Sequence, residues 1–419
     1  MDVSNAPVRA PRGSRRALFI LAGLAAGLTT GVLAGGTDHA AAVQAIARPV
    51  GKLWLDGLTM TVVPLVFALL VTGIAGAAQS TGGRTARRAM LWFAGLLVAA
   101  CLVSAAATTL ALAAWPVPAQ AGALKSASQP PAISSPGAWF ENIVPTNPVK
   151  AAADTAMVPL VVFAVLFGFA LSRIDPPPRA ALQSVFAGLA QAMLVIVDWV
   201  LWLAPIGVFA LAVGVGITAG ASVAGVLAHY IVIVVGACLL ATAIAAASAV
   251  VAGRMPIVQF ARAALPAQIV AMSTQSSLAS LPAMVAAAAP LGAGRAAAGI
   301  VLPLAVSLFR LASAAANVTV AVYLGHVHGI ALSPADLALG ALVAAAVSIA
   351  AVGLPAQVSF FAVIGPVCIA MGVPLTLLPL LLAIETIPDV FRTVGNVTGG
   401  MAVTRIVGRA SAGQPAAPV

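Results

Sequence analysis

Three ionisable residues, Glu385, Asp389 and Arg392, lie in a stretch near the C-terminal end that is otherwise rich in apolar residues. Their spacing of four and then three residues places all three side chains on one face of a helix. A charge at the centre of a bilayer costs roughly 2.5–3.5 kcal/mol on insertion scales, so such a face turns toward protein, a partner or a ligand. This face carries both signs, as a site for a zwitterion with an extra carboxylate requires. The alternative is an Asp389–Arg392 pair that only fixes the helix to its neighbours.

The composition identifies the setting as a membrane. Of the 419 residues, 62% are hydrophobic and 7% are charged, which is typical of a polytopic membrane protein embedded in the lipid bilayer. The net charge of +10 does not indicate nucleic-acid binding, because basic residues such as Arg84, Arg254 and Arg409 cluster in short connecting or terminal segments. Such clusters are topology signals. We therefore expect a cell (inner) membrane protein with both termini in the cytoplasm.

Cysteine and histidine give little support for metal or redox chemistry. Cys101, Cys238 and Cys368 lie in apolar surroundings without close pairs, so we expect buried thiols rather than disulfides or metal ligands. His326 and His328 form one close pair, which is weak evidence for a metal site. We expect no metal and no cofactor.

The arrangement of apolar segments changes two thirds of the way along the chain. Segments 257–290 and 340–373 are interrupted at their centres by S-T-Q-S-S-L-A-S-L-P and A-A-V-G-L-P-A-Q. Broken backbone at membrane depth is tolerated only where it is buried in protein or lines a cavity, so each segment predicts a re-entrant hairpin. Positive-inside orientation makes the two hairpins enter from opposite faces, as in an inverted repeat around one site. The other predicted spans are 17–36, 53–78, 89–116, 156–173, 180–214, 222–253, 296–324 and 376–407.

Two further segments are expected to lie outside the membrane. Residues 410–419 are predicted to form a disordered tail. The Pro/Ala/Ser-rich segment 117–155 is predicted to be an extracellular loop.

Several motifs in this order resemble the glutamate transporter family, the dicarboxylate/amino acid:cation symporters. The resemblance implies an all-α fold of eight transmembrane helices plus two re-entrant hairpins, a homotrimer, and a transport domain that slides against a scaffold. It implies that residues 1–253 form mainly scaffold and trimerisation helices, with the third and sixth spans joining the transport domain, and that residues 254–409 form the core transport domain. The motifs are M-T-V-V-P-L-V-F (60–67), V-P-T-N-P-V-K (144–150), V-V-F-A-V-L-F-G-F-A-L (161–171), A-P-I-G-V-F-A-L (204–211), S-T-Q-S-S-L-A-S-L-P (273–282), V-G-L-P-A (352–356) and D-V-F-R-T-V-G-N-V-T-G (389–399).

The resemblance also implies roles for the polar residues. Asp389 would bind the α-amino group of the substrate, and Arg392 would bind its side-chain carboxylate, to which a guanidinium is geometrically matched. Thr393 and Asn396 would complete the polar contacts. The two hairpin tips would supply the remaining groups: Ser276 and Ser277 at the first, facing the α-carboxylate, and Gly353 at the second. For the serines, ordinary loop polarity is the alternative.

The chain departs from the family where sodium is bound. The family carries N-M-D-G-T in its seventh helix, and here Phe309 and Leu311 replace its Asn and Asp. Gly400 replaces a second aspartate. Sodium is a hard cation that needs several oxygen ligands, so tight sodium binding is not expected. Arg310 stands in the same motif, and we hypothesise that it substitutes for the bound cation; the alternative is that it snorkels or pairs with Glu385.

These features favour a secondary active transporter that imports L-glutamate or L-aspartate. Glu385 is the expected proton carrier, which makes the transport proton-coupled and sodium-independent. Three alternatives stay open: a C4-dicarboxylate transporter, a neutral amino acid symporter or exchanger, and a non-transporting receptor. An enzyme is not expected, because the serines of the first hairpin have no histidine base nearby, and His229 is the one intramembrane candidate.

Overall fold

The chain is predominantly helical in the residues that the computed structural model describes, which are 12–78, 83–118, 144–220, 223–350 and 356–412. Within these ranges, five helical stretches are long and apolar enough to cross a membrane: Ala40–Thr72, Arg84–Ala114, Pro176–Trp202, Ala224–Val251 and Ala297–His328. This confirms an all-α protein with several membrane-capable helices, as expected of a polytopic membrane protein. The count of eight spans plus two hairpins stays a prediction.

Two of the predicted spans in the first half are interrupted. The segment 53–78 breaks at Met60–Thr61, and the segment 180–214 breaks at Leu203. The physical reason is proline: Pro64 and Pro205 each follow the break and remove one i→i−4 hydrogen bond. In chain order the elements are α1 (Arg12–Ala34), α2 (Ala40–Thr59), α3 (Val62–Ala78), α4 (Gly83–Ala114), α6 (Pro148–Ala153), α7 (Met157–Leu171), α8 (Pro176–Trp202), α9 (Ala204–Ala219) and α10 (Val223–Val251).

The second half contains the predicted pairs of interrupted helices. The first pair meets at Gln275–Ser276, where Gln275 adopts a left-handed conformation with φ of 50°. The tip of the second pair, residues 351–355, lies outside the described residues, and with it Gly353. The elements are α11 (Ile257–Thr274), α12 (Ser277–Ala286), α13 (Arg295–Leu308), α14 (Leu311–His328), α15 (Pro334–Ala350), α16 (Ala356–Ala370), α17 (Leu378–Ile384) and α18 (Thr386–Ala412).

The two helices predicted to be continuous, 296–324 and 376–407, are each broken near the middle. The first opens at Phe309–Arg310, between α13 and α14, where ψ rises to 87° and 64°. The second breaks at Glu385, between α17 and α18. Pro388 lies four residues after Ile384 and has no N–H to bond its carbonyl, which explains why α17 ends there. Both breaks place ionisable residues at the interruptions themselves.

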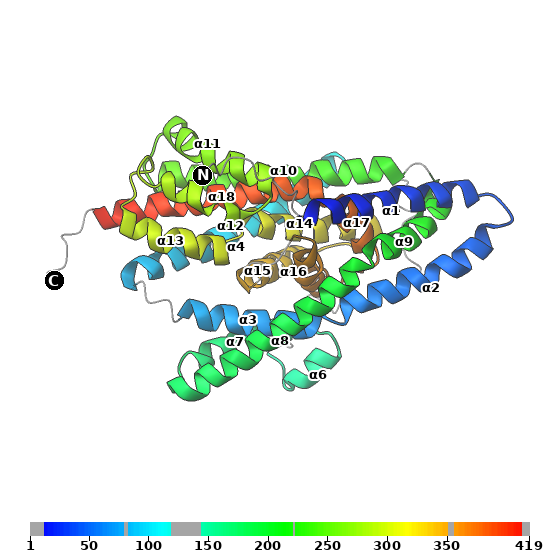
Figure 1. The fold of residues 1–419 in the computed structure, drawn as a ribbon, viewed down its shortest axis with the longest axis horizontal. Coiled ribbons are helices and arrows are strands. Elements are labelled where there is room, and N and C mark those ends of the chain that lie inside the picture. The colour runs from blue at the N-terminus through cyan, green and yellow to red at the C-terminus, as the bar shows by residue number, and fades with distance from the viewer. Residues whose placement is uncertain (1–11, 79–82, 119–143, 221–222, 351–355, 413–419) are drawn as a thin grey trace, which may run out of the picture.

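Helix α18 lies in the middle of the C-terminal half (Figure 1). It packs against α10, α11, α13 and α14, while α4 packs against α14 and α15. At another edge, α1 and α9 approach closely because glycines line their contact: a Cβ on Gly27 would lie 2.8 Å from that of Ala212. The core around α14 consists largely of buried alanine and valine side chains. The division into scaffold and transport domains stays a prediction.

Candidate functional site

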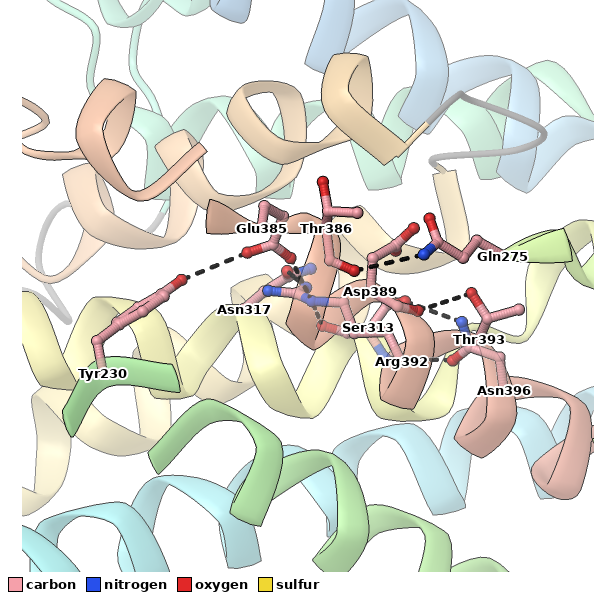
Figure 2. A network of polar contacts seen from close by, with 10 residues as sticks. All are labelled: Tyr230, Gln275, Ser313, Asn317, Glu385, Thr386, Asp389, Arg392, Thr393 and Asn396. Atoms are coloured by element: carbon pink, nitrogen blue, oxygen red, sulfur yellow. Dashed lines mark hydrogen bonds and ion pairs between the residues drawn. The ribbon is translucent and has the colours of Figure 1, made fainter. Parts of the chain in front are cut away.

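The charged face predicted on the last helix is buried, and its central contact is an ion pair between Glu385 and Arg392. Nε of Arg392 lies 2.7 Å from Oε1 of Glu385, and both side chains are about 5% exposed. The hydroxyl of Tyr230 in α10 donates to Oε2 of the same carboxylate at 3.4 Å. The partner of Arg392 in the ion pair is therefore Glu385, which the sequence analysis had paired only with Arg310. Figure 2 shows this contact at the junction of α17 and α18.

The opposite side of the Arg392 guanidinium faces α14. Its Nη1 donates to Oδ1 of Asn317 at 2.6 Å and to the carbonyl of Ser313 at 3.4 Å. Its Nη2 is buried and has no hydrogen-bond partner within the described residues. One nitrogen of a buried guanidinium is thus left for a group from outside the described structure, since buried polar atoms are as a rule hydrogen-bonded.

Asp389 lies one turn after Glu385 and is also buried. It interacts electrostatically with the guanidinium groups of both Arg392 and Arg310. Arg310 reaches this cluster from the break between α13 and α14, where it is half-buried. The hydroxyl of Thr393 donates to the backbone carbonyl of Asp389 at 2.9 Å. The cluster therefore combines two carboxylates with two guanidinium groups.

Asn396 of α18 holds the first turn of α14, directly after the helix break at Phe309–Arg310. Its Oδ1 accepts hydrogen bonds from the backbone N–H groups of Ala312 at 3.0 Å and Ser313 at 3.2 Å. Its Nδ2 donates to the hydroxyl of Ser313 at 2.8 Å. The side chain thus satisfies N–H groups in the first turn of α14 that lack intrahelical partners. A direct contact between Asn396 and a substrate stays a prediction.

The tip of the first hairpin lies beside the start of α18. Ser276 is the N-cap of α12, and its hydroxyl accepts from the N–H of Ala279 at 3.2 Å. Ser277 is the first residue of α12, and both serines are half-buried. The side chain of Gln275 donates to the carbonyl of Thr386 at 3.5 Å (Figure 2), which connects this tip to the charged cluster. A carboxylate at this helix start would lie near backbone N–H groups of the first turn and the positive end of the helix dipole.

The sequence analysis missed Tyr230 and Asn317, which hold the two sides of the ion pair. Both were detectable in principle, because a polar side chain within a membrane span is rare and is usually functional. Asn317 interrupts a run of alanine and valine in α14, and Tyr230 is one of two tyrosines in the chain.

The positions that align with sodium ligands of the family have apolar surroundings. Phe309 is buried and stacks on Phe93 of α4 with 4.5 Å between ring centroids. A Cβ on Gly400 would lie 3.0 Å from the Met284 methyl and 3.1 Å from Cβ of Ala305. Methyl and aromatic groups do not coordinate a hard cation, so these residues do not fit the sodium sites that the resemblance implies.

Comparison with known proteins gives a consistent picture over nearly the whole chain. A family model described as the sodium:dicarboxylate symporter family matches residues 17–410. The proton/glutamate-aspartate symporter of Escherichia coli is 26% identical over 376 residues, which cover 87% of this chain and 85% of that protein. The C4-dicarboxylate transport protein of Rhizobium johnstonii is 27% identical over 374 residues, which cover 86% of this chain and 82% of that protein. The proton/sodium-glutamate symport protein of Bacillus caldotenax is 27% identical over 396 residues, which cover 91% of this chain and 90% of that protein.

Proposed function

The chain belongs to the sodium:dicarboxylate symporter family, and from this premise we propose that it imports acidic amino acids, L-glutamate or L-aspartate, by proton-coupled secondary transport. The observation that carries the substrate assignment is the buried guanidinium of Arg392, whose Nη2 has no hydrogen-bond partner among the described residues and which interacts with the carboxylate of Asp389. A guanidinium suits the distal carboxylate of such a substrate, and a carboxylate suits its ammonium group. Thr393, Ser276 and Ser277 complete the proposed site.

We propose that Glu385 carries the coupling proton. The groups that face it are Tyr230 and Cys238 of α10 and Asp389 and Arg392 of α18. Burial disfavours the charged carboxylate and the guanidinium favours it, so a carboxyl group in this setting is suited to exchange a proton. An acidic amino acid is an anion at neutral pH, so its import into a negative interior needs a compensating cation.

In this proposal the guanidinium group of Arg310 supplies the positive charge that a bound sodium ion would otherwise supply. The support is its electrostatic interaction with Asp389, from the helix break between α13 and α14. The apolar packing around Phe309 and Gly400 also supports this role of Arg310, since the aromatic and methyl groups there do not provide oxygen ligands for sodium. The transporter would then be indifferent to sodium.

A C4-dicarboxylate is the second candidate substrate. Asp389 already interacts with two guanidinium groups, so the cluster does not require an ammonium group to balance its charge. The similarity to C4-dicarboxylate transport proteins is of the same order as that to glutamate symporters. In either case we propose a homotrimer in the cell inner membrane, with cytoplasmic termini and an elevator-like movement of residues 254–409.

The test is uptake of radiolabelled L-glutamate, L-aspartate and succinate into proteoliposomes, under a proton gradient and separately under a sodium gradient. The proposal expects accumulation of an acidic amino acid that follows the proton gradient and does not change when sodium is replaced by choline. Accumulation of succinate alone would select the second candidate. Strict dependence on sodium would contradict the role of Arg310, and no uptake of any of the three would contradict the transport function.

A further inference from the structure

The contacts of Arg392 raise the question of how a substrate carboxylate reaches it. A carboxylate binds a guanidinium bidentately along an edge of two nitrogens. At the Nε–Nη2 edge the carboxylate of Glu385 lies in an ion pair with Nε, and at the Nη1–Nη2 edge Nη1 donates a hydrogen bond to Asn317. Neither Nε nor Nη2 has a hydrogen-bond partner within the described residues, and Nε contacts Glu385 only through the ion pair at 2.7 Å. A bidentate substrate must therefore displace either Glu385 or Asn317.

Charge decides between the two. The Asn317 amide is neutral, and its displacement would leave Glu385 and the substrate as two carboxylates on one guanidinium. Displacement of Glu385 leaves one carboxylate on one guanidinium, and Glu385 becomes neutral when it takes up a proton. In a buried setting the uncompensated second charge is strongly unfavourable. The Tyr230 hydroxyl already holds Oε2 and provides a partner for the carboxyl group that leaves.

We infer that Asn317 holds the guanidinium of Arg392 in place while Glu385 and the distal carboxylate of the substrate alternate on its other edge. This inference rests on the proposed function and adds to it the residue that determines selectivity for acidic substrates. Asn317 is a positioning residue: its 2.6 Å hydrogen bond to Nη1 fixes the plane of the guanidinium. The carbonyl of Ser313 supports the same nitrogen at 3.4 Å.

Asn317 is expected to affect binding of only one end of the substrate, the distal carboxylate. Asn317 acts through Arg392 on the distal carboxylate and has no part in binding the α-amino and α-carboxyl groups. A substitution of Asn317 should therefore weaken binding of L-aspartate much more than binding of L-asparagine, in which a neutral amide replaces that carboxylate. A general loss of packing would weaken both equally.

The experiment measures how strongly L-aspartate and L-asparagine compete for binding of the transported substrate. Succinate and its monoamide succinamate are compared in the same way. Shifts in melting temperature that each compound induces provide a second readout. Asn317→Ala is expected to lower the affinity for the acid by about tenfold, the effect of losing one hydrogen bond to a charged group, and to leave that for the amide unchanged. Asn317→Asp is expected to lower the affinity for the acid further, because the carboxylate of the new aspartate then competes permanently with the substrate for Arg392. Asn317→Ser is the milder variant if either of these fails to fold.

The matched control is Thr319→Val, on the same helix. Thr319 is buried and its hydroxyl hydrogen-bonds to Thr108 of α4 at 3.0 Å, away from Arg392. Its substitution should leave the ratio of acid to amide affinity unchanged. Folded Asn317 variants with the wild-type ratio, or with equal losses for acid and amide, would overturn the inference alone. Wild-type protein that binds none of the acids would overturn the proposed function and the inference with it.

Discussion

At the scale of single residues, the site is defined by how its charges are paired. Glu385 and Arg392 form the tight contact at 2.7 Å, while Asp389 interacts electrostatically with both Arg392 and Arg310. A buried ion pair loses much of its Coulombic gain to desolvation, so it is weak evidence for a purely stabilising role. The arrangement is better explained as a set of charges that a substrate and a proton can rearrange.

One prediction at this scale concerns the proton carrier. Glu385→Gln keeps a side chain that can accept from Tyr230 but removes the group that takes up a proton. Accumulation driven by a proton gradient should be lost, whereas exchange of internal for external substrate should persist, because exchange needs no net proton movement. Counterflow and gradient-driven uptake, measured in the same proteoliposomes, separate the two. Undiminished accumulation by the variant would show that another group carries the proton.

A second prediction concerns the fixed cation. Arg310→Met should impair uptake severely, by about tenfold or more, because the buried carboxylates lose one compensating positive charge. The matched control is Arg295→Met, an exposed arginine at the start of α13, which should keep its uptake. Initial rates at equal amounts of reconstituted protein provide the comparison. Wild-type rates in Arg310→Met would remove the case for a cation substitute.

At the scale of elements, the two helix breaks bring the charges together. The first turn of α14 is capped across the interface by Asn396 of α18, and Glu385 occupies the junction where α17 ends. A glycine allows this close approach: a Cβ on Gly395 would collide with Cβ of Ala312 and lie 2.7 Å from the Thr242 hydroxyl. The breaks are therefore supported by contacts between helices as well as by proline.

The prediction at this scale is that Gly395→Ala separates α14 from α18. Overpacking of a close contact costs typically about 1–3 kcal/mol, and here it would also move the first turn of α14 away from Asn396. Thermal unfolding of the purified protein should show a lower melting temperature and weaker substrate binding. Gly236→Ala in α10 is the control, because a Cβ there meets no neighbour within 4 Å. Equal melting temperatures for the two variants would argue against the close contact.

At the scale of the whole molecule, charge balance constrains the transport cycle. The empty cluster of Glu385, Asp389, Arg310 and Arg392 has two negative and two positive groups and is neutral overall when all are ionised. An acidic amino acid adds one negative charge, and one proton on Glu385 restores neutrality. Both the empty and the occupied cluster can therefore cross the low-dielectric membrane without net charge, which minimises the desolvation cost.

This balance predicts electroneutral transport with one proton for each acidic amino acid. Uptake driven by a pH gradient should be insensitive to a membrane potential imposed with potassium and valinomycin. The measurement compares initial rates at equal pH gradient with and without that potential. A rate that rises with a negative interior would mean that more than one positive charge accompanies the substrate.

The sequence by itself determined the membrane setting, the family and the ionisable residues, because hydropathy and the motif D-V-F-R-T-V-G-N-V-T-G are local properties of the chain. It also placed Arg310 and Phe309 where sodium ligands were expected. Only the tertiary structure decided that Glu385 pairs with Arg392, since a spacing of seven residues specifies a shared face but not a partner. The roles of Asn317 and Tyr230 likewise depend on how α14 and α10 pack against α18, which no local pattern encodes.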